Sequence, residues 1–157
     1  MANDLIDMNT NQILDLSQML SKSHLIPASY SKPEDCFYAL LLAKELGLTP
    51  MFALTNIYVA KSGKPTIESA GKLAMVQSSG LLKSIVYDEE TPERCQITME
   101  RTSPNLKKTL AYTIEQAKQA GLLAKDNWRN YPARMLKARV ISWLCDDLFS
   151  DVMRGIS

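Results

Sequence analysis

The chain is poor in the side chains that most often build metal or catalytic centres. It has one histidine, His24, and three cysteines, Cys36, Cys95 and Cys145. The cysteines are too far apart for the short spacing of a zinc site, and their odd number does not suit a disulfide framework. Widely spaced thiols are typical of a protein in a reducing cytoplasm. A lone histidine beside an apolar pair gives no support for a Ser-His-Asp arrangement.

Long apolar runs and nucleotide motifs are also missing. No apolar stretch approaches 18 residues, so we predict no membrane span, and the polar, acidic start of the chain is unlike a signal peptide. Gly71-Lys72 has Thr66 where a phosphate-binding loop needs its first glycine, and Leu73 where it needs Ser or Thr. We therefore predict a cytoplasmic protein that has no cofactor and is not an enzyme.

The remaining acidic groups are weak candidates for catalysis. Asp88-Glu89-Glu90 and Asp146-Asp147 are runs of adjacent carboxylates, and such runs usually face solvent. A nuclease that uses them would need a clustered site, so magnesium-dependent DNA cleavage is the least favoured activity.

The length of 157 residues suits one domain with its own core. We expect residues 1–20 to form an N-terminal arm and the start of a first helix, and residues 21–157 to form a single core domain. Proline, glycine and capping residues mark the elements. Helices are expected over 11–21, 33–46, 50–56, 68–79, 113–121 and 131–149, a hairpin over 57–67, and strands over 84–88, 95–101 and 108–112. This order predicts an α+β fold with an antiparallel meander.

Charge is distributed unevenly along a nearly neutral chain. The net charge is +1, yet residues 101–139 hold nine Lys or Arg and two Asp or Glu, while the first 100 residues are net acidic. A basic block in a neutral protein is typical of a local polyanion site, and a solvated face without a ligand is the alternative.

The densest part of this block is the run from Trp128 to Arg139. It carries two aromatic rings and four cations at a turn that leads into the last predicted helix. On that helix, Leu136, Val140, Trp143 and Leu144 fall on one arc, which we expect to be buried. Arg134 and Lys137 share one side and form the better pair for a phosphate backbone.

Three members of the run have a structural alternative. Arg139 lies four residues before Trp143, so a cation–π contact inside the protein competes with a role in binding. Trp128 and Tyr131 can stack on bases or pack beneath the start of the helix, and for Trp128 packing is slightly favoured. Arg129 has no apolar role and is the stronger candidate for a ligand contact.

A set of short motifs occurs in a characteristic order along residues 20–157. They are Leu25-Ile26-Pro27, Glu45 to Pro50, Asn56 to Val59, Gly63-Lys64-Pro65, Ser79-Gly80-Leu81, Ala117 with Ala120-Gly121-Leu122, Trp128, Tyr131-Pro132 and Arg134 to Arg139. Together they resemble the RecT family of phage recombination proteins, which is related to the lambda Red-beta annealing protein. No single motif is specific, but the ordered set is.

The resemblance implies an ATP-independent protein that anneals single-stranded DNA in phage-type homologous recombination. Such proteins bind single-stranded DNA and the annealed duplex intermediate as a homo-oligomer, either a ring or a helical filament. A phage exonuclease or a host single-strand-binding protein is a further implied partner. The implied fold is a twisted antiparallel sheet with a β-hairpin, packed with helices around a positively charged groove.

Carried onto this chain, the resemblance places eight cations and one ring along that groove. Trp128 would help to hold the strand, and the cations are Lys61, Lys64, Lys107, Lys108, Arg129, Arg134, Lys137 and Arg139.

Two departures favour a second interpretation. Many relatives have an arginine where this chain has Leu144-Cys145-Asp146-Asp147. Larger relatives continue past the position of Ser157 into a tail, which in some of them contacts other proteins. A degenerate relative that acts as a structural or protein-interaction module, without annealing activity, is therefore the alternative.

Overall fold

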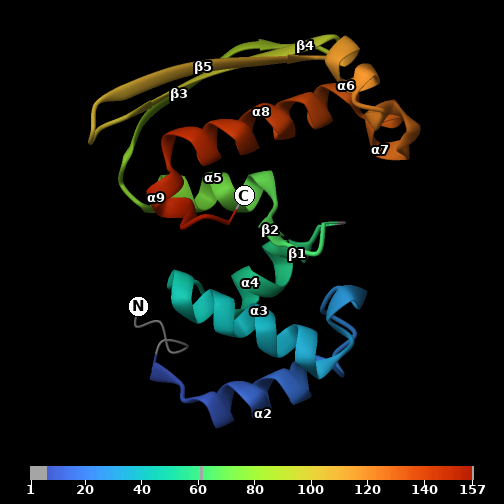
Figure 1. Ribbon diagram of the computed structural model, residues 1–157, viewed down its shortest axis with the longest axis vertical. Helices are drawn as coiled ribbons and strands as arrows, with labels where there is room; N and C mark the ends of the chain where they lie inside the picture. Colours follow the sequence, from blue (N-terminus) through green and yellow to red (C-terminus); the bar gives the residue numbers. More distant parts are fainter. Residues whose placement is uncertain (1–6, 61, 157) are drawn as a thin grey trace. The chain divides into compact units, whose positions relative to one another are not determined.

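The computed structural model describes residues 7–60 and 62–156 and has an α+β fold with two small antiparallel sheets (Figure 1). The α+β prediction is confirmed. The chain divides into two compact units, the first ending at Glu68 and the second beginning at Ser69. The expected arm over 1–20 and core over 21–157 stay a prediction, and the first six residues of that arm lie outside the described residues.

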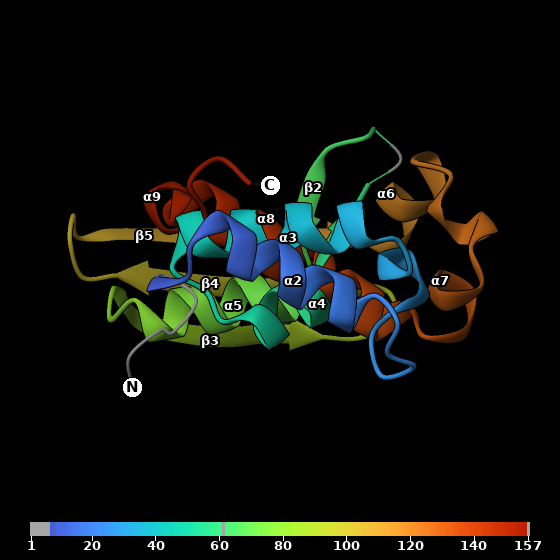
Figure 2. The same cartoon turned by 90° about the horizontal axis from the view of Figure 1, so that it is seen from below.

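The first unit is mainly helical. Its helices are α2 (Thr10–Leu20), the short 3-10 helix η1 (Ala28–Tyr30), α3 (Pro33–Leu46) and α4 (Pro50–Asn56). α2 and α3 lie side by side (Figures 1 and 2). Among the described residues, no single helix is long and apolar enough to cross a membrane. Helices α3 and α4 reach the required length and composition only when they are taken together, and this pair is bent by 117°.

Local chemistry sets the ends of these helices. Asn9 and Gln12 form a reciprocal capping box at the start of α2, and Thr49 caps α4. Gly47 ends α3 in the left-handed conformation, at φ 71°, which a residue without a Cβ adopts at little cost. Buried residues of α2, α3 and α4 then pack together, among them Ile13, Leu40 and Leu54.

A two-stranded hairpin completes the first unit. β1 (Ile57–Val59) pairs antiparallel with β2 (Pro65–Ile67), and Ile57 and Ile67 face each other at its buried end. The hydroxyl of buried Tyr30 donates a hydrogen bond to the Ile57 carbonyl, and burial raises the pKa of Tyr30 to about 12. This contact ties the hairpin to the loop between α2 and α3.

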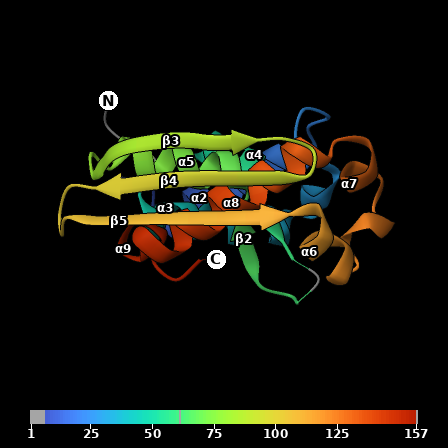
Figure 3. The same cartoon turned by 90° about the horizontal axis from the view of Figure 1, so that it is seen from above.

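The second unit contains a three-stranded antiparallel sheet in the order β3-β4-β5. The strands are β3 (Leu82–Glu90), β4 (Arg94–Arg101) and β5 (Leu106–Thr113), and Figure 3 shows β4 in the centre. β4 and β5 pair residue for residue, whereas β3 has two register shifts. The buried residues Cys95, Ile97 and Met99 alternate along β4, which defines the inner face of the sheet.

Helices cover that inner face and one end of the sheet. α8 (Pro132–Leu148) packs on β4 and β5, and α5 (Ser69–Ser78) packs on the other side of α8 (Figure 1). α6 (Ile114–Gln119), η2 (Leu122–Ala124) and α7 (Asp126–Asn130) connect β5 to α8, and α9 (Ser150–Met153) follows it. The unit therefore has three layers: sheet, α8 and α5.

Most predicted elements are present, with two additional short α-helices, two additional 3-10 helices and one correction. The predicted α3, α4, hairpin, meander and α6 are confirmed, including the capping box of Thr113 and Gln116. The short helices α7 and α9 were not predicted. The expected burial of Trp143 is wrong, because its side chain is 39% exposed. The buried residues of α8 are Leu136, Val140, Ile141, Leu144, Cys145 and Leu148.

Candidate nucleic-acid interface

The corner between α7 and α8 is built by the Tyr131-Pro132 pair. Proline disfavours a helical conformation in the residue before it, and its fixed φ suits the first turn of the next helix. α7 accordingly ends at Asn130, Tyr131 lies between the helices at φ −136° and ψ 57°, and α8 begins at Pro132. The corner breaks the run from Trp128 to Arg139 into two helices, so its side chains project in several directions.

Trp128 lies in the protein interior, with its side chain only 3% exposed. Its ring meets Tyr112 of β5 edge-on, with 6.3 Å between the centroids, and Tyr112 makes a second edge-on contact with Trp143 at 5.0 Å. Of the two roles left open for Trp128, the geometry favours packing beneath the helix over stacking on a base.

Arg139 lies against this aromatic cluster. Its guanidinium carbon is 5.6 Å from the Trp143 ring centroid and 6.0 Å from that of Trp128. These distances are within the range of a cation–π contact, so the structural alternative for Arg139 is realised. Arg139 is half-buried and makes no ion pair within residues 7–60 and 62–156.

Lys137 is bonded to the sheet. Its ammonium donates a 2.8 Å hydrogen bond to Glu90 at the end of β3 and lies 4.2 Å from the centroid of the Tyr87 ring. The bond to Glu90 raises the pKa of Lys137 above its usual range. Because Glu90 already compensates the charge of this ammonium, a phosphate would compete with Glu90 for it.

Arg129 and Arg134 are both exposed, on either side of the corner. Arg129, in the last turn of α7, pairs with Asp126 at the surface. Arg134, in the first turn of α8, makes no ion pair with any residue that the structure describes. Arg134 is therefore the member of this segment that can take a phosphate without giving up an existing partner.

Lys107 and Lys108 point to opposite faces of β5. Lys107 pairs in register with Glu100 on the outer face, while Lys108 faces inward and bonds Asp147 of α8 at 2.6 Å. Alternation along a strand requires this separation, since neighbouring side chains project to opposite sides. The two lysines cannot act as one patch on the same face of the sheet.

The outer face of the sheet carries charges of both signs. Arg94 bonds Glu89, Lys83 bonds Glu100 at 2.6 Å, and the Thr98 hydroxyl contacts Asp88 and Thr109. The bond to Lys83 lowers the pKa of the Glu100 carboxyl. Positive and negative charges are therefore mixed on the outer face, and Lys107 lies near the start of β5.

The hairpin residues belong to the first unit. Lys64 is exposed beside the left-handed Gly63, just before β2, and makes no ion pair with another described residue. Lys61 lies outside the described residues. Among the described residues, the hairpin therefore contains one of its two predicted cations, Lys64.

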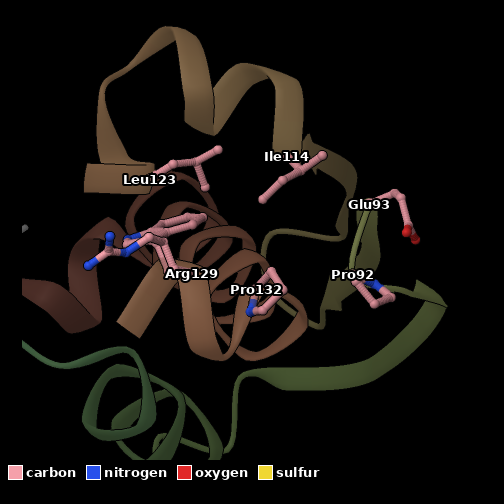
Figure 4. A pocket seen from close by; sticks show the side chains of 7 residues that line it. Pro92, Glu93, Ile114, Leu123, Arg129 and Pro132 are labelled. Carbon is pink, nitrogen blue, oxygen red and sulfur yellow. The ribbon is translucent and has the colours of Figure 1, made fainter. Parts of the chain in front are cut away.

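A shallow depression of about 450 Å³ lies beside the corner (Figure 4). Pro92, Ile114, Leu123 and Pro132 provide apolar walls, and part of the Trp128 ring also lines it. The charged side chains of Glu93 and Arg129 lie at its two ends (Figure 4). The depression has an apolar surface, with no charged group in its centre.

Two buried cations that the sequence did not single out hold the second unit together. Lys72 of α5 is 1% exposed and donates to both oxygens of Asp146, at 2.6 and 2.7 Å, and to the Ser142 hydroxyl at 3.0 Å. Arg101 donates to the Asp151 carboxylate and to the Ser103 and Leu148 carbonyls. Each links α8 or α9 to a neighbouring layer, and Arg101 lowers the pKa of Asp151.

The carboxylates considered for catalysis all have internal partners. Asp88, Glu89 and Glu90 contact Thr98, Arg94 and Lys137 respectively. Among the described residues there is no group of three or more His, Cys, Asp or Glu side chains that could hold a metal ion. The chain matches neither a protein-family model nor a curated protein.

Proposed function

We propose that this chain is an ATP-independent single-strand annealing protein of the RecT type, acting in phage-type homologous recombination. The observation that carries the proposal is Arg134, an exposed cation without an ion-pair partner, beside exposed Arg129 at the α7–α8 corner. This corner lies inside the basic block over 101–139, and the ordered motifs of the sequence support the same function. The proposed ligands are single-stranded DNA and the nascent duplex.

The proposed mechanism is electrostatic. Cations hold the phosphates, which leaves the bases available to a complementary strand, and base pairing itself supplies the specificity. Several subunits along one strand would keep it extended and reduce the entropy lost on pairing. The finer fold, in which a twisted sheet, the hairpin and the helices together surround a positively charged groove, belongs to this proposal.

The proposed contacts fall into three groups according to their present partners. Lys64 and Arg134 make no ion pair among the described residues, while Lys107 and Arg129 are exposed next to a carboxylate. At Lys108 and Lys137, phosphates would compete with Asp147 and Glu90. Arg139 would act from its position against Trp128 and Trp143, and Lys61 stays a prediction from the sequence.

The test is annealing of two complementary oligonucleotides at low salt without ATP. We expect the protein to raise the annealing rate, and we expect the double variant Arg134→Glu, Lys137→Gln to lose most of its DNA binding. Glutamine is chosen at 137 because a second carboxylate beside Glu90 would destabilise the fold through repulsion. A failure of the unchanged protein to accelerate annealing would contradict the proposal.

A matched control distinguishes the loss of the proposed DNA contacts from a general loss of positive charge. Lys22→Glu, Lys32→Glu changes two exposed lysines of the first unit and lowers the net charge by slightly more than the test variant does. We expect this control to keep nearly all of its binding. If both variants lose affinity equally, the phosphate contacts lie elsewhere.

The second candidate function is a structural or protein-interaction module. It is favoured by the ion pairs Lys108–Asp147 and Lys137–Glu90, which neutralise two of the predicted DNA contacts inside the protein. Asp147 also lies in the segment that departs from the family pattern. Stable binding to a protein partner, with no measurable DNA affinity at low salt, would decide for this candidate.

A further inference from the structure

Tyr131 is an exposed aromatic residue without a partner. Its side chain is 62% exposed, and it makes no ring contact, cation–π contact or hydroxyl hydrogen bond with any part of the chain that the structure describes. Of the other aromatic side chains near the corner, Trp128 and Tyr112 are buried against each other, while Trp143 is 39% exposed but contacts Tyr112 and Arg139. Tyr131 is therefore the aromatic side chain of the run from Trp128 to Arg139 that reaches solvent.

In the sequence, this residue lies between two exposed arginines. Tyr131 is the single residue between α7 and α8, two positions after Arg129 and three before Arg134. Pro132 fixes the start of α8, so Tyr131 is attached to a backbone whose conformation is set by the adjoining helix. An aromatic face flanked by cations is the arrangement with which proteins bind single strands, since rings stack on bases and cations hold phosphates.

We infer that Tyr131 is the residue on which a nucleobase of the bound strand stacks, in place of Trp128. This inference rests on the proposed function and names the contact that the function uses. Stacking suits a protein that must accept any sequence, because every base has a flat face and no hydrogen-bond code is read.

The experiment measures affinity for a single-stranded oligonucleotide and for the same backbone lacking its bases. Tyr131→Ala should bind the normal strand roughly tenfold more weakly, in line with alanine substitutions at stacking sites, and Tyr131→Phe should restore binding. All three proteins should bind the abasic strand equally. The matched control is Tyr38→Ala, which removes a 51% exposed tyrosine from α3 and should leave both affinities unchanged.

The salt dependence of DNA affinity distinguishes base stacking by Tyr131 from phosphate contact by Arg134. Tyr131→Ala should lower the affinity without changing the slope of log affinity against log salt, whereas Arg134→Ala should reduce that slope by about 0.7, the value for one phosphate contact with a single strand. Thermal melting followed by circular dichroism should confirm that the exposed Tyr131→Ala variant stays folded.

The outcomes distinguish this inference from the proposed function. Unchanged affinity of Tyr131→Ala in a protein that still anneals DNA would overturn the stacking role alone. Loss of self-association with retained DNA affinity would also overturn it, because the ring would then belong to a protein interface. Absence of DNA binding by the unchanged chain would overturn both the inference and the proposed function.

Discussion

The cations of the α7–α8 corner differ in what surrounds them. Arg134 is exposed to solvent. Lys137 contacts Glu90 and Tyr87, and Arg139 lies against the rings of Trp128 and Trp143. Spacing on the helix indicated the contact of Arg139 with Trp143, but it could not reveal the other partners, because Glu90 and Tyr87 come from β3 and Trp128 comes from α7. A residue's availability to a phosphate therefore depends on strands that are far away in the sequence.

The pairing of Lys137 with Glu90 leads to a prediction at the residue scale. Glu90→Gln should raise the affinity for single-stranded DNA about two- to fivefold, since it frees an ammonium from an exposed ion pair worth at most about 1 kcal/mol. Fluorescence anisotropy of a labelled oligonucleotide at low salt measures the change.

The control for this prediction is Glu115→Gln. Glu115 is an exposed residue of α6, and its substitution changes the net charge by the same amount. If Glu90→Gln gains no more affinity than Glu115→Gln, then Lys137 does not contact the strand.

At the scale of elements, the contact between α5 and α8 depends on one buried ion pair. Lys72 is almost completely inside the protein, whereas the Asp146 side chain is 21% exposed. Removing either partner therefore leaves a charge in a different environment: a buried ammonium in one case and a partly hydrated carboxylate in the other. The cost of leaving a charge unpaired is larger when that charge is buried.

This asymmetry predicts unequal stability losses. Asp146→Asn should lower the free energy of unfolding by about 3 kcal/mol, and Lys72→Met by about 1 kcal/mol, because only the first leaves a buried charge without its partner. Urea unfolding followed by circular dichroism measures both. Asp147→Asn is the matched control, and it should cost less than about 1 kcal/mol because its pair with Lys108 is exposed. Equal losses for the two partners of the buried pair would show that the burial difference does not matter.

The elements that could be predicted from the sequence are those with strong local boundaries. Pro33 and Gly47 delimit α3, Thr49-Pro50 starts α4, and the capping box of Thr113 starts α6. α7 and α9 were missed because helices of one turn have too few residues to show a period.

The burial of α8 could be predicted only in part. Leu136, Val140 and Leu144 were expected to be buried and are. Trp143 was assigned to the same arc because a single buried face was expected for this helix. Instead, α8 packs on the sheet and also on α5, so that its buried residues include Ile141 and Cys145. The sequence also indicated the cations of the candidate site and one partner, Trp143 for Arg139, but not the carboxylates that pair with Lys108 and Lys137. It slightly favoured packing for Trp128, and it left the exposure of Tyr131 open.

At the scale of the whole molecule, charge is balanced while its distribution is not. The chain has 18 Lys or Arg and 17 Asp or Glu, so attraction to a polyanion cannot come from net charge. It must come from particular cations close to the phosphates, and such binding releases condensed counterions.

This balance predicts a strong salt dependence at nearly zero net charge. With five or six phosphate contacts, the slope of log affinity against log salt should be about −4, so that binding falls by roughly two orders of magnitude between 50 and 200 mM salt. Titrations at four or more salt concentrations give the slope. A slope near zero would mean that the strand is held by something other than these cations.

The aromatic cluster of Trp128, Trp143, Tyr112 and Arg139 has a practical consequence. The chain contains two tryptophans, and both belong to this cluster in the second unit, whereas the first unit has tyrosines such as Tyr30 and Tyr58 instead. Intrinsic indole emission is therefore a built-in reporter of one corner of one unit. Its transition can be set beside the helical signal of the whole chain to show whether the two units melt as one.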